Sequence, residues 1–272
     1  MKFSASFGLI ADLRAAIGVA TLPTLRAIWR EPSLVLRPTA LSRTFMAAVW
    51  AAFAAPTDEG ARAAKLKLIS PHARGAVLDI GAGLGHSVDY LDRTRVTQYI
   101  ALEPNTLMHP AIRARANKAG FREADGSLLV LAACGAEDTE AIRALLAAHG
   151  GQVDTLLTVM TLCCIPEPEA ALARLVRGVL KSGGALLFYE HVLSPRADVA
   201  WWQRFWTPLW RLAFDGCCLD RPTHVWIDAM EDVGPGGERV GMWSERAVWG
   251  KDGEPEEHLF WHRAGRFVKH SD

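Results

Sequence analysis

The chain has 272 residues, of which 50% are hydrophobic, and it carries 30 basic and 30 acidic side chains. This size supports one substantial domain with additions at its ends. A net charge of zero provides no excess of cations to neutralise phosphates, which argues against a dedicated nucleic-acid binder. The cysteines form two adjacent pairs and a singleton without C-x-x-C spacing, so we expect reduced thiols and neither a zinc cluster nor a disulfide framework: Cys134, Cys163, Cys164, Cys217 and Cys218.

Residues 1–70 are predicted to form a mostly helical N-terminal cap. Phe45, Trp50 and Phe53 recur at helical spacing in an Ala-rich stretch, and Thr57-Asp58-Glu59 has the composition of a helix start. The longest uncharged run near the N-terminus, residues 15–25, is shorter than the roughly 20 residues that span a bilayer. We therefore expect a cytoplasmic protein whose first helix packs on the domain, and peripheral membrane contact through that helix remains open.

From residue 71 to 272 the pattern changes to short apolar strands alternating with helical segments. Such alternation predicts an α/β fold, a doubly wound sheet of parallel strands covered on both faces. Eight of the ten tryptophans lie beyond residue 200, so the C-terminal additions are Trp-rich. Strands are expected over 76–80, 97–102, 127–132, 153–159, 185–190 and 259–268, with helices from about 87 and over 110–119, 137–149 and 167–180.

The most informative motif follows the first strand, which ends in Asp79 and runs into glycines at every second position, Gly81, Gly83 and Gly85, with Ala82 between the first two. Glycine lets a backbone turn tightly and approach a ligand closely. The dinucleotide fingerprint would require glycine where the chain has His86, and the Lys-Ser/Thr pair of a P-loop is absent. Asp79, Gly81, Ala82 and Gly83 are thus candidate cofactor-binding residues.

Three further segments are expected at the same edge of the sheet, because the carboxyl ends of parallel strands meet there. Glu103 ends the second strand, 18 residues after Gly85, and is placed to accept the hydroxyls of a ribose. The remaining candidates for cofactor contacts follow the second, third and fourth strands: Pro104, Asn105, Ala136, Glu137, Val159 and Met160.

The order of these four elements resembles the Rossmann-like methyltransferases that use S-adenosyl-L-methionine (SAM). A closer resemblance, from about residue 40 to the end apart from 230–258, is to the methyltransferase-like alkyl thiol S-methyltransferases. It is carried by 153–165, Glu190-His191-Val192, Phe214-Asp215-Gly216-Cys217 and 262–269. The resemblance implies SAM as cofactor and a small-molecule acceptor, with a thiol as the candidate. The loop after the fourth strand, residues 160–165, contains no acidic side chain, so no metal is expected.

Two residues are candidates for catalysis. His191, at the end of the fifth strand, is a base or orienting group, or a histidine hydrogen-bonded beneath the pocket. Asp215 polarises His191 or the acceptor, or caps a turn. Trp206 and Trp210 share one face of a helix and form either a pocket wall or core. Trp50 and Cys217 complete the predicted substrate pocket.

Several other interpretations stay open. The acceptor atom could be oxygen, nitrogen or carbon, and a fold that binds SAM without methylating could serve as a cyclase or a binding protein. An NAD(P) oxidoreductase is disfavoured by His86. A membrane-interaction protein would rest on the N-terminal helix alone.

Overall fold

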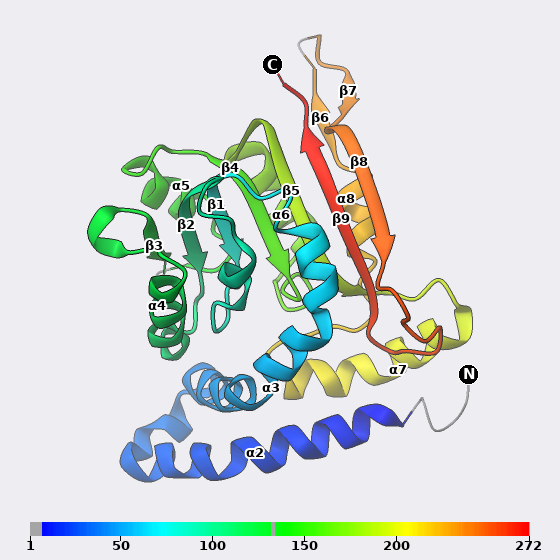
Figure 1. Cartoon of the computed structure of the whole chain (residues 1–272). Coiled ribbons are helices and arrows are strands. Elements are labelled where there is room, and N and C mark those ends of the chain that lie inside the picture. The colour runs from blue at the N-terminus through cyan, green and yellow to red at the C-terminus, as the bar shows by residue number, and fades with distance from the viewer. Residues whose placement is uncertain (1–6, 132–133, 235, 272) are drawn as a thin grey trace.

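A computed structural model describes residues 7–131, 134–234 and 236–271. Its centre is a seven-stranded sheet in the order β3-β2-β1-β4-β5-β9-β8 (Figure 1). The first five of the chain are parallel, and β9 and β8 complete one edge in antiparallel pairing. The strands of this sheet are β1 (Gly75–Ile80), β2 (Val96–Leu102), β3 (Leu128–Leu131), β4 (Val153–Val159), β5 (Leu180–Val192), β8 (Trp243–Gly250) and β9 (Trp261–Lys269). The predicted doubly wound α/β fold is confirmed.

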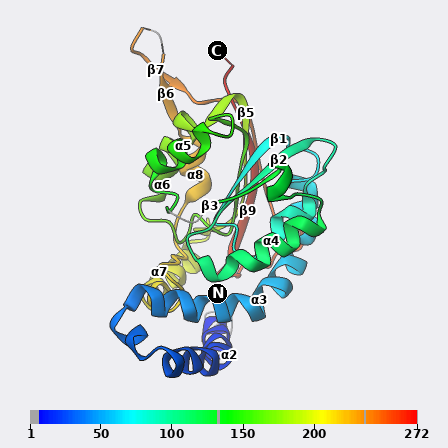
Figure 2. The same cartoon turned by 90° about the vertical axis from the view of Figure 1, so that its left-hand side faces the viewer.

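Helices cover both faces of the sheet, as Figure 2 shows edge-on. On one face, α5 (Thr139–Ala147), α6 (Pro168–Gly178) and α8 (Thr223–Asp228) bury apolar side chains against the strands. On the other face, α4 (His109–Lys118) and the second half of α3 (Pro38–Leu68) do the same. Since both faces are covered, the central strands are mostly apolar and do not alternate between apolar and polar residues.

The N-terminal helices lie across the carboxyl ends of the parallel strands (Figure 1). Helix α2 (Gly8–Arg30) packs along the first half of α3, and Pro56 lies inside α3, where a proline kinks a helix. Figure 1 shows that α3 bends along its length from the α2 layer toward the sheet. Helix α7 (Ala197–Ala213) lies beside this layer, with Trp202 and Trp206 packed on Phe7. A division of the chain near residue 70 into cap and domain remains our proposal.

Two sequence-based expectations were wrong, and one part of the C-terminal structure was not predicted. Thr57-Asp58-Glu59 does not start a helix, because α3 continues through Pro56. The glycine turn is followed by a 3₁₀ turn, His86–Tyr90, and not by a full helix. The stretch 230–258 contains β8 and a hairpin of β6 (Glu231–Val233) and β7 (Arg239–Gly241), because β8 pairs with β9 and extends the sheet. The expected end of the third strand at Ala132 lies outside the described residues.

Gly265 of β9 is a site where a small substitution should be costly. A Cβ there would lie 2.4 Å from a ring carbon of Phe188 and 3.0 Å from the carbonyl oxygen of Ala247. We expect Gly265→Ala to destabilise the fold by about 1–3 kcal/mol in urea unfolding, since overpacking a dense core forces neighbours to shift. Gly18→Ala is the control: nothing lies within 4 Å of its Cβ, so the better helix former should stabilise α2 slightly. Equal effects of the two substitutions would contradict the packing argument.

Candidate active site

A cavity of about 410 Å³ lies at the carboxyl edge of the sheet, between β1 and β4. This is the point where the strand order reverses, the usual ligand site of a doubly wound sheet. The volume falls in the range of about 300–1,000 Å³ that is typical of small-molecule pockets. Of the predicted residues, the cavity is lined by Gly81, Ala82, Gly83, Glu103, Pro104, Asn105, Ala136, Glu137, Val159, Met160, Trp50 and Asp215.

The glycine turn forms the floor of the cavity. Gly81 and Gly83 adopt positive φ angles of 66° and 56°, a conformation that glycine adopts without strain. A Cβ on Gly83 would have no atom within 4 Å, although the residue lines the cavity. A side chain there would therefore project into open space, and glycine leaves that space for a ligand.

Glu103 braces this turn from the end of β2. Its Oε2 accepts a hydrogen bond from the backbone N–H of Gly83 at 2.9 Å, and its Oε1 accepts one from Asn105 N–H at 2.8 Å. Burial raises the pKa of Glu103 above its ordinary value. Each carboxylate oxygen keeps a lone pair beyond the one used here, so two ligand hydroxyls fit the same group.

Asp79 does not line the cavity, so the structure does not bring it together with the other predicted cofactor contacts. Its carboxylate accepts a hydrogen bond from Tyr99 Oη at 2.8 Å inside the sheet. Burial raises the pKa of Asp79 to about 6. The alternation of side chains along a strand directs this residue into the core, although it stands only two positions before the glycine turn.

A buried polar network at the cavity was not predicted. Lys65 Nζ donates to Asp58 Oδ1 at 2.7 Å, Tyr90 Oη donates to the same carboxylate at 3.0 Å, and His86 Nδ1 lies 3.5 Å from it. Asp58, Lys65 and His86 line the cavity. One signal was present in the sequence, because Asp58 and Lys65 are seven residues apart and so share a face of a helix.

The predicted catalytic pair is not assembled. His191 does not line the cavity; it is buried, and its Nε2 lies 3.4 Å from the sulfur of Cys217. Burial lowers the pKa of His191. Asp215 is at the cavity, but its carboxylate accepts a hydrogen bond from Ser42 Oγ at 3.1 Å. The described hydrogen bonds do not join Asp215 to His191, so the alternative of a histidine beneath the pocket fits its position.

Three predicted pocket residues also lie elsewhere. Trp206 packs edge-on against Phe7, and Trp210 stacks on Phe214 with ring centroids 3.9 Å apart. Cys217 belongs to the same apolar cluster, under α7. These side chains pack the cap onto the domain instead of walling the cavity.

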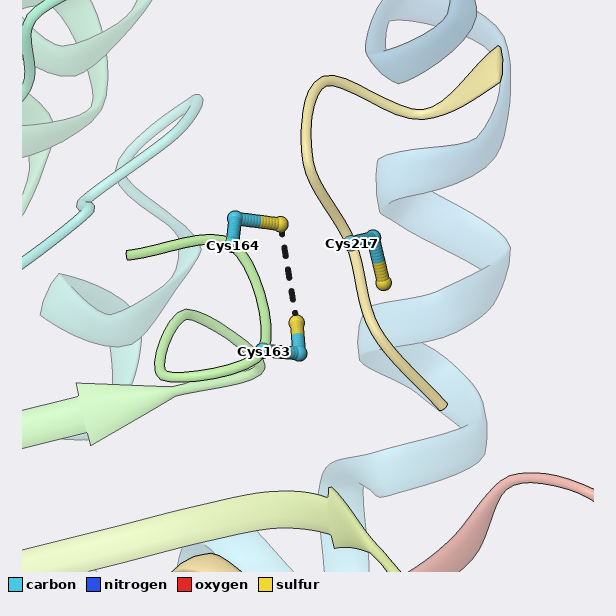
Figure 3. A group of neighbouring side chains, drawn as sticks. All are labelled: Cys163, Cys164 and Cys217. Atoms are coloured by element: carbon cyan, nitrogen blue, oxygen red, sulfur yellow. Dashed lines mark hydrogen bonds between the residues drawn. The ribbon is translucent and has the colours of Figure 1, made fainter. Parts of the chain in front are cut away.

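Three of the cysteines converge beside the cavity (Figure 3). Cys163 and Cys164 come from the loop after β4, and Cys217 comes from the loop after α7. The sulfurs of Cys163 and Cys164 are 3.6 Å apart. Hydrogen bonds from Cys163 and Cys164 lower the pKa of Cys217 well below its ordinary value. Of the three, Cys164 lines the cavity.

Glu190 makes the stability of the folded state depend on pH. Its carboxylate accepts backbone hydrogen bonds from Thr161 and Leu162, at 3.0 and 3.2 Å, yet burial raises its pKa from 4.5 to about 7. Between these values the folded state binds the extra proton, so stability should fall as pH rises through this window, by up to about 3 kcal/mol.

Glu190→Gln cannot titrate, and we expect it to reduce the difference in unfolding free energy between about pH 5 and about pH 8. Urea unfolding of both proteins at the two pH values measures this. The raised pKa of Asp79 contributes in the same direction in both proteins and cancels in the comparison. An unchanged difference in the variant would contradict the assignment to Glu190.

The chain resembles known proteins both in sequence and in fold. Residues 78–188, which span β1 to β5, match a family model described as a methyltransferase domain. Two solved structures share the fold: an O-methyltransferase family protein from Burkholderia thailandensis and a putative O-methyltransferase from Nostoc punctiforme. Both have a TM-score of 0.52, at 15% and 14% identity, covering 98% and 93% of this chain and 70% and 71% of theirs. Residues 78–188 thus resemble a methyltransferase domain, and the two solved structures show that the chain shares their fold.

Among curated proteins, the chain is similar to the human thiol S-methyltransferases TMT1B and TMT1A. It is 40% identical to TMT1B over 79 residues, which cover 29% of this chain and 31% of the relative. The match to TMT1A is also 40% identical, over 75 residues that cover 26% of this chain and 29% of the relative. These alignments span less than a third of the relatives' own length.

Proposed function

We propose that the chain transfers the methyl group of SAM to the sulfur of a small, largely apolar thiol. The observation that carries this proposal is the 40% identity to thiol S-methyltransferase TMT1B. The cavity supports it, because Met46, Trp50 and Met160 line it beside the polar residues and suit an apolar, polarisable acceptor.

The polar residues of the cavity suit SAM, whereas the apolar residues suit the acceptor. In our proposal Glu103 accepts hydrogen bonds from both ribose hydroxyls of SAM. The absence of a side chain at Gly83 leaves room for SAM to approach the backbone of the glycine turn. Asp58 and Lys65 offer a carboxylate and an ammonium to the oppositely charged groups of the methionine part. Of the site residues predicted from the sequence, those that line the cavity are retained in this proposal, and the others are left out: Asp79, His191, Trp206, Trp210 and Cys217.

Methyl transfer to a thiol depends more on the alignment of donor and acceptor than on a strong base. SAM supplies a methyl group on a sulfonium, and the thiolate forms the new S–C bond as the old C–S bond breaks and its electron pair returns to the donor sulfur. A thiol with a pKa near 8.5 is about a few per cent ionised at neutral pH and releases its proton to solvent. The cavity residues therefore act by orienting the acceptor and excluding water.

Product analysis tests this proposal. The purified chain is incubated with SAM and, separately, an apolar thiol, a phenol and an amine, and S-adenosylhomocysteine and methylated products are measured by mass spectrometry. We expect thioether and S-adenosylhomocysteine in equal amounts with the thiol. Methylation of the phenol or the amine instead would assign another acceptor atom. SAM binding without any S-adenosylhomocysteine would indicate a binding protein.

We also propose that the N-terminal helix contacts a membrane surface. Among the described residues, α2 is the one helix long and apolar enough to cross a membrane by length and composition, with a mean hydropathy of 1.3 in its most apolar window, and it is mostly exposed. Helix α7, beside it, exposes further apolar side chains. The exposed residues of the two helices include Ile17, Leu22, Leu25, Trp29, Trp201, Phe205 and Leu212.

Flotation with liposomes tests this second proposal. The wild type should float with the vesicles, and Leu22→Glu/Leu25→Glu should stay in the dense fraction, because charged groups disfavour the apolar interface. Leu145→Glu, an exposed leucine of α5, is the matched control and should float. Equal behaviour of the three proteins would contradict a role of α2.

A further inference from the structure

The sulfurs of Cys163, Cys164 and Cys217 lie within 4.8 Å of one another, at the wall of the candidate active site (Figure 3). Zinc–sulfur bonds of about 2.3 Å at tetrahedral angles separate two sulfurs by about 3.8 Å. The Cys163–Cys164 separation of 3.6 Å is close to this value. We propose that this cluster is a binding site for a soft, thiophilic metal ion, of which Zn²⁺ is the representative.

A nitrogen atom lies next to one of the three sulfurs. His191 Nε2 lies 3.4 Å from the Cys217 sulfur, and sulfur and nitrogen ligands on one tetrahedral zinc are separated by about 3.5 Å. The His191 side chain is buried, and its Nδ1 has no hydrogen-bond partner within the described residues. The group whose ligand atoms all lie within 4.8 Å of one another comprises the three cysteines without His191, so the proposed site rests on the three thiols.

The loops that carry the cysteines are fixed before any ion binds. Cys218 N–H donates to the Cys163 carbonyl at 3.0 Å and ties the two loops together. The Arg221 guanidinium donates to the carbonyls of Leu162 and Ile165, at 2.6 and 2.7 Å, and encloses the cysteine pair. The same cation compensates part of the negative charge that three thiolates would place on a divalent ion. Functional sites depend on such support of their ligands by the surrounding hydrogen bonds.

The ligand types select the ion. Thiolate sulfur and imidazole nitrogen favour zinc or cuprous ion over the hard cations that carboxylates bind. A second cluster, Glu254 with His258 and His262, also gathers potential ligands, but there the carboxylate accepts a hydrogen bond from each histidine and the group is satisfied without an ion. The cysteine cluster has only the weak hydrogen bonds of thiols.

The site was not expected from the sequence, which lacks C-x-x-C spacing. Folding brings together an adjacent pair and a cysteine more than 50 residues later in the chain. Because Cys164 lines the cavity, a bound ion would lie at the cavity wall.

The test is retention of zinc by the full chain, without SAM or acceptor, so that it is independent of the proposed methyl transfer. The protein, kept reduced with a phosphine, is mixed with Zn²⁺ and desalted, and bound metal is measured by mass spectrometry. A competing chromophoric chelator gives the affinity. We expect about one zinc ion per chain, at least tenfold weaker binding in each of Cys163→Ser, Cys164→Ser and Cys217→Ser, and wild-type binding in Cys134→Ser.

A second measurement, made on the wild-type protein, tests the proposal even if the cysteine variants fail to fold. In the wild-type protein, Zn²⁺ should slow alkylation of Cys163, Cys164 and Cys217 and leave Cys134 unaffected, as read by peptide mass spectrometry. Failure to retain zinc, or retention lost in His262→Ala and kept in all three cysteine variants, would overturn the proposal.

Discussion

Glu103→Ala is expected to weaken SAM binding by two to four orders of magnitude. In our proposal the carboxylate accepts two ribose hydroxyls, and hydrogen bonds to a charged group contribute about 1.5–3 kcal/mol each, or about 3–6 kcal/mol together. The substitution also removes the acceptor of the 2.9 Å hydrogen bond from Gly83 N–H, so the glycine turn loses an interaction that stabilises it. Isothermal titration with SAM and with S-adenosylhomocysteine measures the loss.

Two further variants locate the cause. Glu103→Gln keeps the shape and one acceptor oxygen and should lie between the wild type and Glu103→Ala. Glu123→Ala removes an exposed glutamate paired with Arg113, away from the cavity, and should bind SAM normally. Wild-type affinity in Glu103→Ala would remove this residue from the cofactor site.

Lys65→Met is expected to destabilise the fold by about 3–5 kcal/mol, because it leaves the Asp58 carboxylate buried without its cation. The side chains of Asp58 and Lys65 are 9% and 6% exposed, so solvent does little to screen the pair. Tyr90 Oη would remain as a donor, but it carries no charge. Urea unfolding at neutral pH gives the free-energy difference.

The same helix provides the control. Arg62 and Glu59 form an ion pair of 2.7 Å, but both side chains are more than half exposed. Arg62→Met should therefore cost no more than about 1 kcal/mol. The double variant Asp58→Asn/Lys65→Met should recover part of the loss, since it removes the unpaired charge. If Lys65→Met were as mild as Arg62→Met, the buried pair would not stabilise the fold.

Local sequence determined the parts of this protein that are contiguous along the chain. Glycines at 81, 83 and 85 specify a turn that few other residues can adopt, and β1 and β2 are short apolar runs that end in that turn and in Glu103. A parallel sheet then brings these ends together without further information. For this reason the class of fold, the cavity edge and most of the residues that line this edge were predictable.

Tertiary structure decided which side chain at a strand end faces the cavity and which faces the core. Neighbouring strand residues point to opposite faces, so a difference of one position separates a ligand contact from a core residue. Asp79 and His191 both stand at strand ends, and packing turned both of them away from the cavity. The Asp58–Lys65–His86 network and the three-cysteine cluster join segments that only the folded chain brings together, since α3, the glycine turn and the loop after α7 are far apart in sequence.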